Sequence, residues 1–143
     1  MEIVKRLNVP VEYLYDTVVK SVLADIKTQT GKKIPVHKLK GYKYIKTFSK
    51  NARATIQIED LVENRLYQYR TSTNKNDFLV IYQFKPLSGN RCELHYTEKM
   101  ESHGYLQKIN DAFVGIIWAR LRKRRFHAML NEIEQHYLTQ QNK

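Results

Sequence analysis

The chain has 143 residues, of which 42% are hydrophobic and 11% aromatic, which suits one folded domain over 1–143 and excludes a disordered chain. Its longest apolar run, at 113–118, is far shorter than the ~20 residues that cross a bilayer, and we expect no signal peptide because the N-terminus has no apolar stretch of that kind. Cys92 is the only cysteine, so no internal disulfide can form and we expect a cytoplasmic protein.

The net charge of +11 is concentrated in two basic blocks. Residues 27–57 contain nine lysines and arginines and no acidic residue. Blocks of this kind attract polyanions, but they are equally typical of the solvated surface of a basic protein. The second block lies near the end of the chain and consists of Arg120, Arg122, Lys123, Arg124 and Arg125.

The first elements that the sequence predicts are a strand and a helix. Apolar residues alternate over 2–9, which indicates a strand. Pro10 stops this strand and suits the first turn of a helix, and apolar residues then recur at helical spacing over 11–28. Gly31 is well placed to end the helix. The basic segment 32–40 is interpreted as a loop or a short second helix.

The middle of the chain predicts five strands in a meander. In most of them, apolar and aromatic residues alternate with polar ones, which is the pattern of a half-buried strand. Short polar connections join the strands, so neighbours should run antiparallel. We expect the strands at 41–48, 53–62, 65–73, 78–84 and 91–101, with connections at 50–51, 63–64, 74–77 and 86–90.

The last third of the chain, from about residue 104 to residue 138, predicts one long amphipathic helix. At 1.5 Å per residue it would span roughly 50 Å, so its apolar face needs a broad partner, and the strands are the only candidate. This order predicts an α+β domain in which a curved antiparallel sheet of about six strands wraps around the C-terminal helix, with an N-terminal helix between the first two strands. The apolar positions of the long helix recur mostly at spacings of three, four or seven, at Leu106, Ile109, Phe113, Ile116, Ile117, Leu121, Leu130, Ile133 and Tyr137.

Three segments carry a resemblance to a known superfamily. They are EIVKRLNVPVEYLYDTVV at the start, ARATIQIEDLVENRLYQYRTS in the middle and YLQKINDAFVGIIWARL in the final helix. Together with the order of elements, they make nearly the whole chain resemble the START-like, pollen-allergen-like superfamily (SRPBCC, the helix-grip fold), and within it a small bacterial family of unknown function. The resemblance implies a space between sheet and terminal helix that commonly holds an apolar ligand, and it implies no shared catalytic residue.

We therefore expect a small apolar or amphipathic ligand between the sheet and the final helix. Several mid-strand tyrosines share faces with apolar residues, and aromatic rings with a few polar tips suit a small-molecule site. The alternative is ordinary aromatic packing, which sheets favour in any case. The expected lining residues, which would supply shape and desolvation rather than chemistry, are Tyr82, Phe84, Leu94, Tyr96, Phe113, Ile117 and Leu121.

The sequence carries no motif that indicates catalysis, a metal or a cofactor, and we expect none of these. Cys92 and His95 are three residues apart on a strand and face opposite sides, so Cys92 is interpreted as a small buried hydrophobe. Glu98 falls on an otherwise apolar face, where a buried carboxylate would need a partner such as Arg70 or a tyrosine. The simpler interpretation places Glu98 near the strand's end, partly solvated.

Two further functional classes compete with ligand binding. In the first, the protein is an interaction module whose basic blocks dock an anionic partner, either nucleic acid, an acidic protein or an anionic lipid. We expect Arg122, Arg124 and Arg125 to face water, although no recognition motif or exposed aromatic platform accompanies them. In the second, the protein is an enzyme of the cyclase or hydratase type that works through polar groups in the cavity.

Overall fold

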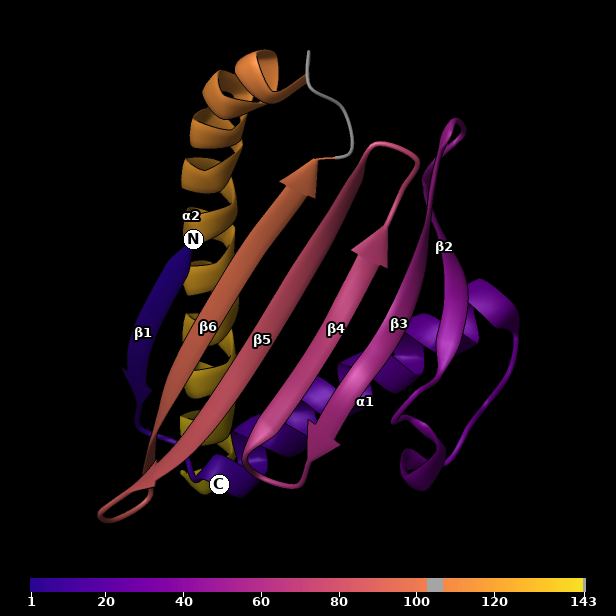
Figure 1. Ribbon diagram of the computed structural model, residues 1–143. Coiled ribbons are helices and arrows are strands. Elements are labelled where there is room, and N and C mark those ends of the chain that lie inside the picture. Colours follow the sequence, from indigo (N-terminus) through magenta and orange to yellow (C-terminus); the bar gives the residue numbers. More distant parts are fainter. Residues whose placement is uncertain (103–106, 143) are drawn as a thin grey trace.

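The computed structural model describes the backbone of residues 1–102 and 107–142 and the side chains of residues 1–101 and 122–142. Within these residues, six strands form one antiparallel sheet in the order β1-β6-β5-β4-β3-β2. Both α-helices lie on the same face of this sheet (Figure 1). The elements are β1 (Glu2–Leu7), α1 (Val11–Thr30), the 3₁₀ turn η1 (Val36–Lys38), β2 (Lys43–Ser49), β3 (Ala52–Val62), β4 (Leu66–Ser72), β5 (Asn76–Leu87), β6 (Arg91–Ser102) and α2 (Gln107–Gln141).

This architecture confirms the predicted α+β helix-grip fold, with a curved antiparallel sheet, an N-terminal helix between the first two strands and a long C-terminal helix. The first strand, β1, pairs with the last, β6, so β1 forms one edge of the sheet. β2 forms the other edge. Across the described ranges, no helix combines the length and the apolar character needed to span a membrane.

The ends of α1 follow from two residues that the sequence singles out. Pro10 is extended, with φ −62° and ψ 149°, and its carbonyl accepts the first helical hydrogen bond from the Leu14 N–H at 3.2 Å. Gly31 ends the helix with φ 74°, a left-handed conformation that glycine adopts without steric cost. Its N–H donates to the Lys27 carbonyl at 2.8 Å, which satisfies one of the last carbonyls of the helix.

The structure corrects the sequence prediction at β5. The strand has 12 residues, whereas the hydrophobic pattern predicts only 78–84. Asn76 and Asp77 extend it at one end, where they lie opposite residues of β6, and Pro86 extends it at the other, opposite Cys92. The polar composition of these positions resembles that of a loop, but β6 is long enough to pair with all of them. The basic segment after α1 contains only the short turn η1.

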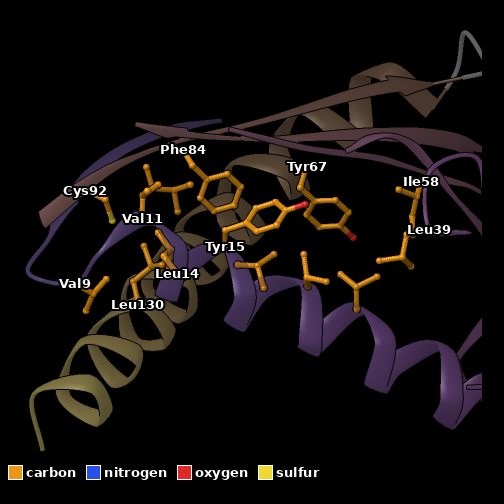
Figure 2. Packing of buried hydrophobic residues seen from close by; sticks show 14 of the residues in the cluster. Val9, Val11, Leu14, Tyr15, Leu39, Ile58, Tyr67, Phe84, Cys92 and Leu130 are labelled. Atoms are coloured by element: carbon orange, nitrogen blue, oxygen red, sulfur yellow. The ribbon is translucent and has the colours of Figure 1, made fainter. Parts of the chain in front are cut away.

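The hydrophobic core lies between the inner face of the sheet and the apolar faces of the two helices. Figure 2 shows Phe84 and Cys92 on the sheet side, above Leu14 and Tyr15 of α1, with Leu130 of α2 beside them. Cys92 is fully buried and burial raises the pKa of its thiol to about 11, so it packs as a small hydrophobe. Leu130 is also fully buried, so one face of the C-terminal half of α2 packs against the core.

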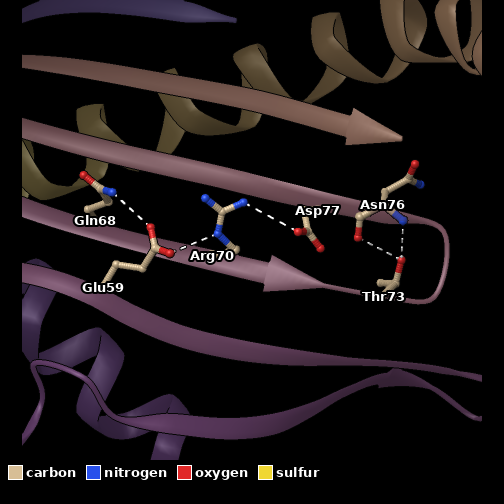
Figure 3. A network of polar contacts seen from close by, with 6 residues as sticks. All are labelled: Glu59, Gln68, Arg70, Thr73, Asn76 and Asp77. Atoms are coloured by element: carbon tan, nitrogen blue, oxygen red, sulfur yellow. Dashed lines mark hydrogen bonds and ion pairs between the residues drawn. The ribbon is translucent and has the colours of Figure 1, made fainter. Parts of the chain in front are cut away.

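The outer face of the sheet carries a polar network over β3, β4 and β5 (Figure 3). Glu59 sits at an irregularity in the register of β3 and accepts hydrogen bonds from Gln68 Nε2 and Arg70 Nε, both at 3.0 Å. These hydrogen bonds hold the pKa of Glu59 below its usual value. Arg70 Nη1 also lies 3.6 Å from Asp77 Oδ2. The network ties the three central strands together on the face away from the helices.

Candidate functional site

A cavity of about 540 Å³ lies between the sheet and the two helices. Tyrosines from the sheet, a stripe of small side chains from α1 and two apolar side chains from α2 line it. The sheet contributes Tyr44, Lys46, Ile56, Tyr67, Tyr69 and Tyr82; α1 contributes Thr17, Val18, Ser21, Val22, Ala24, Asp25 and Thr28; α2 contributes Met129 and Ile133.

Strand alternation brings the tyrosines to one wall. Tyr67 and Tyr69 are two residues apart on β4 and therefore point to the same face, and Tyr82 lies directly opposite Tyr67 on β5. The Tyr67 ring centroid is 5.2 Å from that of Tyr69 and 5.3 Å from that of Tyr82. Figure 2 shows the Tyr67 ring between the sheet and α1. The three rings thus form a continuous aromatic wall.

The helical period of α1 explains the opposite wall. Thr17, Ser21, Ala24 and Thr28 follow one another at spacings of four, three and four residues, so they lie along one flank of the helix. Their side chains are small and leave open the space that a larger residue would fill. Ser21, Ala24 and Thr28 are exposed, so this flank of α1 borders the mouth of the cavity.

A polar cluster joins α1 to β2 at the wall of the cavity. The Tyr44 hydroxyl donates to Asp25 Oδ2 at 2.6 Å. Lys46 Nζ lies 3.1 Å from Asp25 Oδ1, and the two side chains are only 30% and 25% exposed. Lys46 Nζ also lies 5.4 Å from the centre of the Phe48 ring. Asp25 therefore has a partner on each of its carboxylate oxygens.

The cavity tyrosines are neutral at physiological pH. Burial is the main cause that raises the pKa of Tyr69 to about 12, and the nearby carboxylates Glu98 and Asp25 add to it. Burial likewise raises the pKa of Tyr67 and Tyr82. Within the part of the chain that the structure describes, the hydroxyls of these three tyrosines form no hydrogen bond. They are donors available to whatever fills the cavity.

The residues predicted from the sequence to line a cavity are dispersed. Tyr82 lines the cavity described above. Phe84 packs edge-on against Tyr15, with ring centroids 5.5 Å apart, and Leu94 is 1% exposed in the core. Tyr96 is buried in a smaller cluster with Ile3 and Val80. The other predicted lining residues, whose side chains lie outside the described residues, are Phe113, Ile117 and Leu121.

Glu98 has two partners, and one of them corrects the sequence interpretation of the basic block. The Tyr96 hydroxyl donates to Glu98 Oε2 at 2.7 Å, and Arg122 Nη1 lies 2.8 Å from Glu98 Oε1. The Glu98 side chain is only 9% exposed, so it is not partly solvated. Arg122 does not simply face water either, because its guanidinium pairs with Glu98 and lies 6.0 Å from the centre of the Phe78 ring.

The rest of the second basic block lies on the outside of α2. Lys123, Arg124 and Arg125 are exposed, and the side chain of Arg120 lies outside the described residues. In the described ranges there is no group of three or more histidine, cysteine, aspartate or glutamate side chains arranged to hold a metal ion.

Sequence reasoning missed most of the cavity. The mid-strand positions of Tyr67 and Tyr69 were visible, but the pairing partner of each strand decides which rings meet. The wall formed by α1 corresponds to the regular spacing of Thr17, Ser21 and Thr28 in the sequence. The same spacing is typical of the polar face of any amphipathic helix. Asp25 and Lys46 are 21 positions apart, and only the packing of α1 against β2 joins them.

Most of the chain matches one protein family. Residues 1–119 match the family described as "Domain of unknown function (DUF3284)". The chain belongs to this family. The sequence resemblance to a small family of unknown function is thereby supported, and no functionally curated protein matches the chain.

Solved structures place this family member within the START-like, helix-grip fold. The chain is similar to Mll3558 from Rhizobium loti, with 16% identity and a TM-score of 0.52 over 83% of this chain and 92% of that one. It is similar to a conserved protein from Geobacillus kaustophilus, with 14% identity and a TM-score of 0.57 over 94% of each chain. It is also similar to Ara h 8.0201, with 13% identity and a TM-score of 0.54 over 97% of each chain. At these identities the likeness concerns the fold.

Proposed function

We propose that this DUF3284 protein binds a small, partly apolar ligand in the cavity between the sheet and the two helices. The cavity itself carries the proposal. Its volume of about 540 Å³ would hold roughly 18 water molecules, and it falls within the ~300–1,000 Å³ of typical ligand sites. Side chains from α1, α2 and the sheet line this space, so a ligand would lose part of its contact with water.

The composition of the walls supports the same function. Val18, Val22, Ile56 and Ile133 offer apolar contact, and the rings of the tyrosine wall offer both apolar faces and hydroxyl tips. Polar groups set among apolar surfaces give a small-molecule site its orientation and specificity. The ligand would be held by shape, desolvation and hydrogen bonds rather than by covalent chemistry.

The first experiment is native mass spectrometry of the protein as purified from cells, followed by solvent extraction of bound material. We expect a stoichiometric small molecule in the spectrum. A mass equal to that of the bare chain, together with no binding in the variant experiment below, would contradict the proposal.

A matched pair of variants locates the site. Ser21→Trp places a large ring at the mouth of the cavity, whereas Asp16→Trp places the same ring on α1 about 140° away around the helix; both native residues are exposed. Fluorescence titration with 1-anilinonaphthalene-8-sulfonate should show binding to the wild type and to Asp16→Trp, and at least tenfold weaker binding to Ser21→Trp. Equal binding by all three would exclude this cavity as the site.

A second candidate function rests on the outside of α2. Lys123, Arg124 and Arg125 are exposed and form no ion pair with any residue the structure describes, which suits an anionic macromolecule. Binding to single-stranded RNA, DNA or anionic vesicles should then weaken steeply between 50 and about 200 mM salt. Reversal of the three charges to glutamate should abolish it, and no binding of the wild type at low salt would remove this candidate.

A further inference from the structure

We propose that the ligand of the cavity is an anionic amphiphile, a molecule with an apolar chain or ring body and one acid group that binds Lys46 and the tyrosine hydroxyls. This inference rests on the proposed function and names the chemical class of its ligand. Its basis is the set of hydrogen-bond donors around the cavity and the charge of the chain.

Several polar groups of the cavity can donate hydrogen bonds to a ligand. Tyr67, Tyr69 and Tyr82 present phenolic O–H groups that have no acceptor among the described residues, and Lys46 adds an ammonium group. Donors left without partners in a partly buried site cost free energy, so a ligand that supplies acceptors gains most there. Carboxylate, phosphate and sulfate oxygens are acceptors only and form the stronger, charge-assisted hydrogen bonds.

The carboxylate that lines the cavity already has two partners. Among the lining residues that the structure describes, Asp25 is the only acidic one, and its two oxygens are taken by Tyr44 and Lys46. A cationic ligand would have to displace Lys46 from Asp25. An anionic ligand can instead share Lys46 with Asp25, because the ammonium group carries three donors and can serve two acceptors at once.

The net charge of the chain favours the same class of ligand. Arg125 precedes Met129, a lining residue, by one helical turn on the same flank of α2, and it is exposed. The ion pair of Arg122 with Glu98 is neutral as a unit. Glu132 follows Met129 by three residues and is also exposed, so it offsets Arg125 locally. With Asp25 and Lys46 cancelling each other as well, the positive field at the cavity is that of the whole chain, whose net charge is +11. Such a field raises the local concentration of anions.

The experiment compares probes that share a chain and differ in the head group. Calorimetric titrations would use decanoate, 1-decanol and decyltrimethylammonium below their micelle concentrations, with acetate as the head group alone. We expect decanoate to bind about tenfold more tightly than decanol, because one charge-assisted hydrogen bond is worth about that factor. Decyltrimethylammonium should bind most weakly of the three, and acetate should not bind measurably.

Variants of the polar cluster test the roles of its members. Lys46→Met should remove the preference for decanoate over decanol, whereas Lys46→Arg should keep it. Lys43→Met is the matched control, because Lys43 is exposed on the same strand but points to the opposite face; it should leave both affinities unchanged. Asp25→Asn should strengthen decanoate binding several-fold, since it removes the carboxylate that competes for Lys46. A role of Asp25 in structure alone would instead weaken the binding of every probe.

The outcomes separate this inference from the proposed function. Equal binding of decanoate and decanol, or a preference that survives in Lys46→Met, would overturn the anionic class while leaving ligand binding intact. Binding of none of the three chain probes would contradict the proposed function itself. Acetate that binds as tightly as decanoate would reveal a simple anion site and overturn the amphiphile. Circular dichroism of each variant establishes that loss of binding is not loss of fold.

Discussion

At the scale of single residues, Arg122 shows how one charge of a basic run can pair with a buried carboxylate. Its neighbours along the chain, Lys123, Arg124 and Arg125, are exposed, but Arg122 lies on the flank of α2 that approaches β6. There it neutralises Glu98, whose side chain is 9% exposed and would otherwise be a buried, partly unpaired carboxylate. Removal of one member of such a pair is costly because the remaining charge stays desolvated.

Arg122→Met should therefore lower the free energy of unfolding by about 2 kcal/mol, below the ~3–5 kcal/mol of fully buried pairs because the arginine is partly exposed. Urea denaturation measures this. Lys123→Met is the matched control and should change stability by less than about 0.5 kcal/mol. Glu98→Gln in the Arg122→Met background should recover part of the loss, because an amide is less costly to bury than a carboxylate. Equal stability of both single variants would contradict the pairing.

At the scale of elements, the sheet owes its aromatic wall to the pairing of β4 with β5 and of β5 with β6. Tyr67 lies opposite Tyr82, and Tyr82 lies opposite Tyr96, so one row of rings crosses three strands. The Tyr82 and Tyr96 rings meet edge to face with centroids 5.1 Å apart. Since burial raises the pKa of every tyrosine in this row, the folded state holds their protons more tightly than the unfolded state does.

The sign of the resulting pH dependence follows directly. The unfolded chain releases tyrosine protons from about pH 10, whereas Tyr69 in the folded state has a pKa of about 12. The pKa values of Tyr67, Tyr82 and Tyr96 are raised as well. Stability is complete below pH 10 and should fall above it, by up to about 1.4 kcal/mol per pH unit for each tyrosine. Urea denaturation at pH 8, 10 and 11 measures the fall, and Tyr67→Phe should make it less steep. Phenolate absorbance from these residues without loss of structure would contradict the prediction.

The elements themselves were largely predictable, and the site was not. Period-two and period-3.6 patterns predict each strand and both helices, because an element that buries one face carries apolar residues at the period of that element. The ends of β5 were missed because Asn76 and Asp77 have loop-like polarity, and a strand can carry them only when a long neighbour pairs with them. The cavity depends on how α1 lies over β2 and β4, and the spacing of Thr17 and Ser21 contains no information about that distance.

At the scale of the whole molecule, the C-terminal half of α2 is part of the core although the family match ends at residue 119. Leu130 is fully buried, and Phe126, Ile133 and Tyr137 pack against the same cluster. The Tyr137 ring meets that of Tyr13 at 4.8 Å, which joins the end of α2 to the start of α1. Ile133 also lines the cavity. The residues beyond the match are therefore needed for both the fold and the proposed site.

Leu130→Ala should lower the free energy of unfolding by about 2–5 kcal/mol, because it removes a fully buried side chain from a packed core. Leu138→Ala makes the same chemical change eight residues later on the same helix, where the leucine is 36% exposed, and should cost less than about 1 kcal/mol. Thermal and urea denaturation measure both. Similar losses in the two variants would show that α2 contributes through its helical content rather than by packing.

The contacts between β1 and α2 also decide when the protein can fold during synthesis. Lys5 bonds to Asn131 and the Asn8 N–H donates to Glu134, and each pair is separated by 126 positions in the chain. In the described sheet, the only strand that pairs with β1 is β6. A growing polypeptide therefore leaves the edge of β1 unpaired until the ribosome has made β6, and the contacts of β1 with α2 form only later still. Proteins with such long-range contacts fold slowly and expose an aggregation-prone intermediate. Expression at low temperature or with abundant chaperones should therefore raise the yield of native protein.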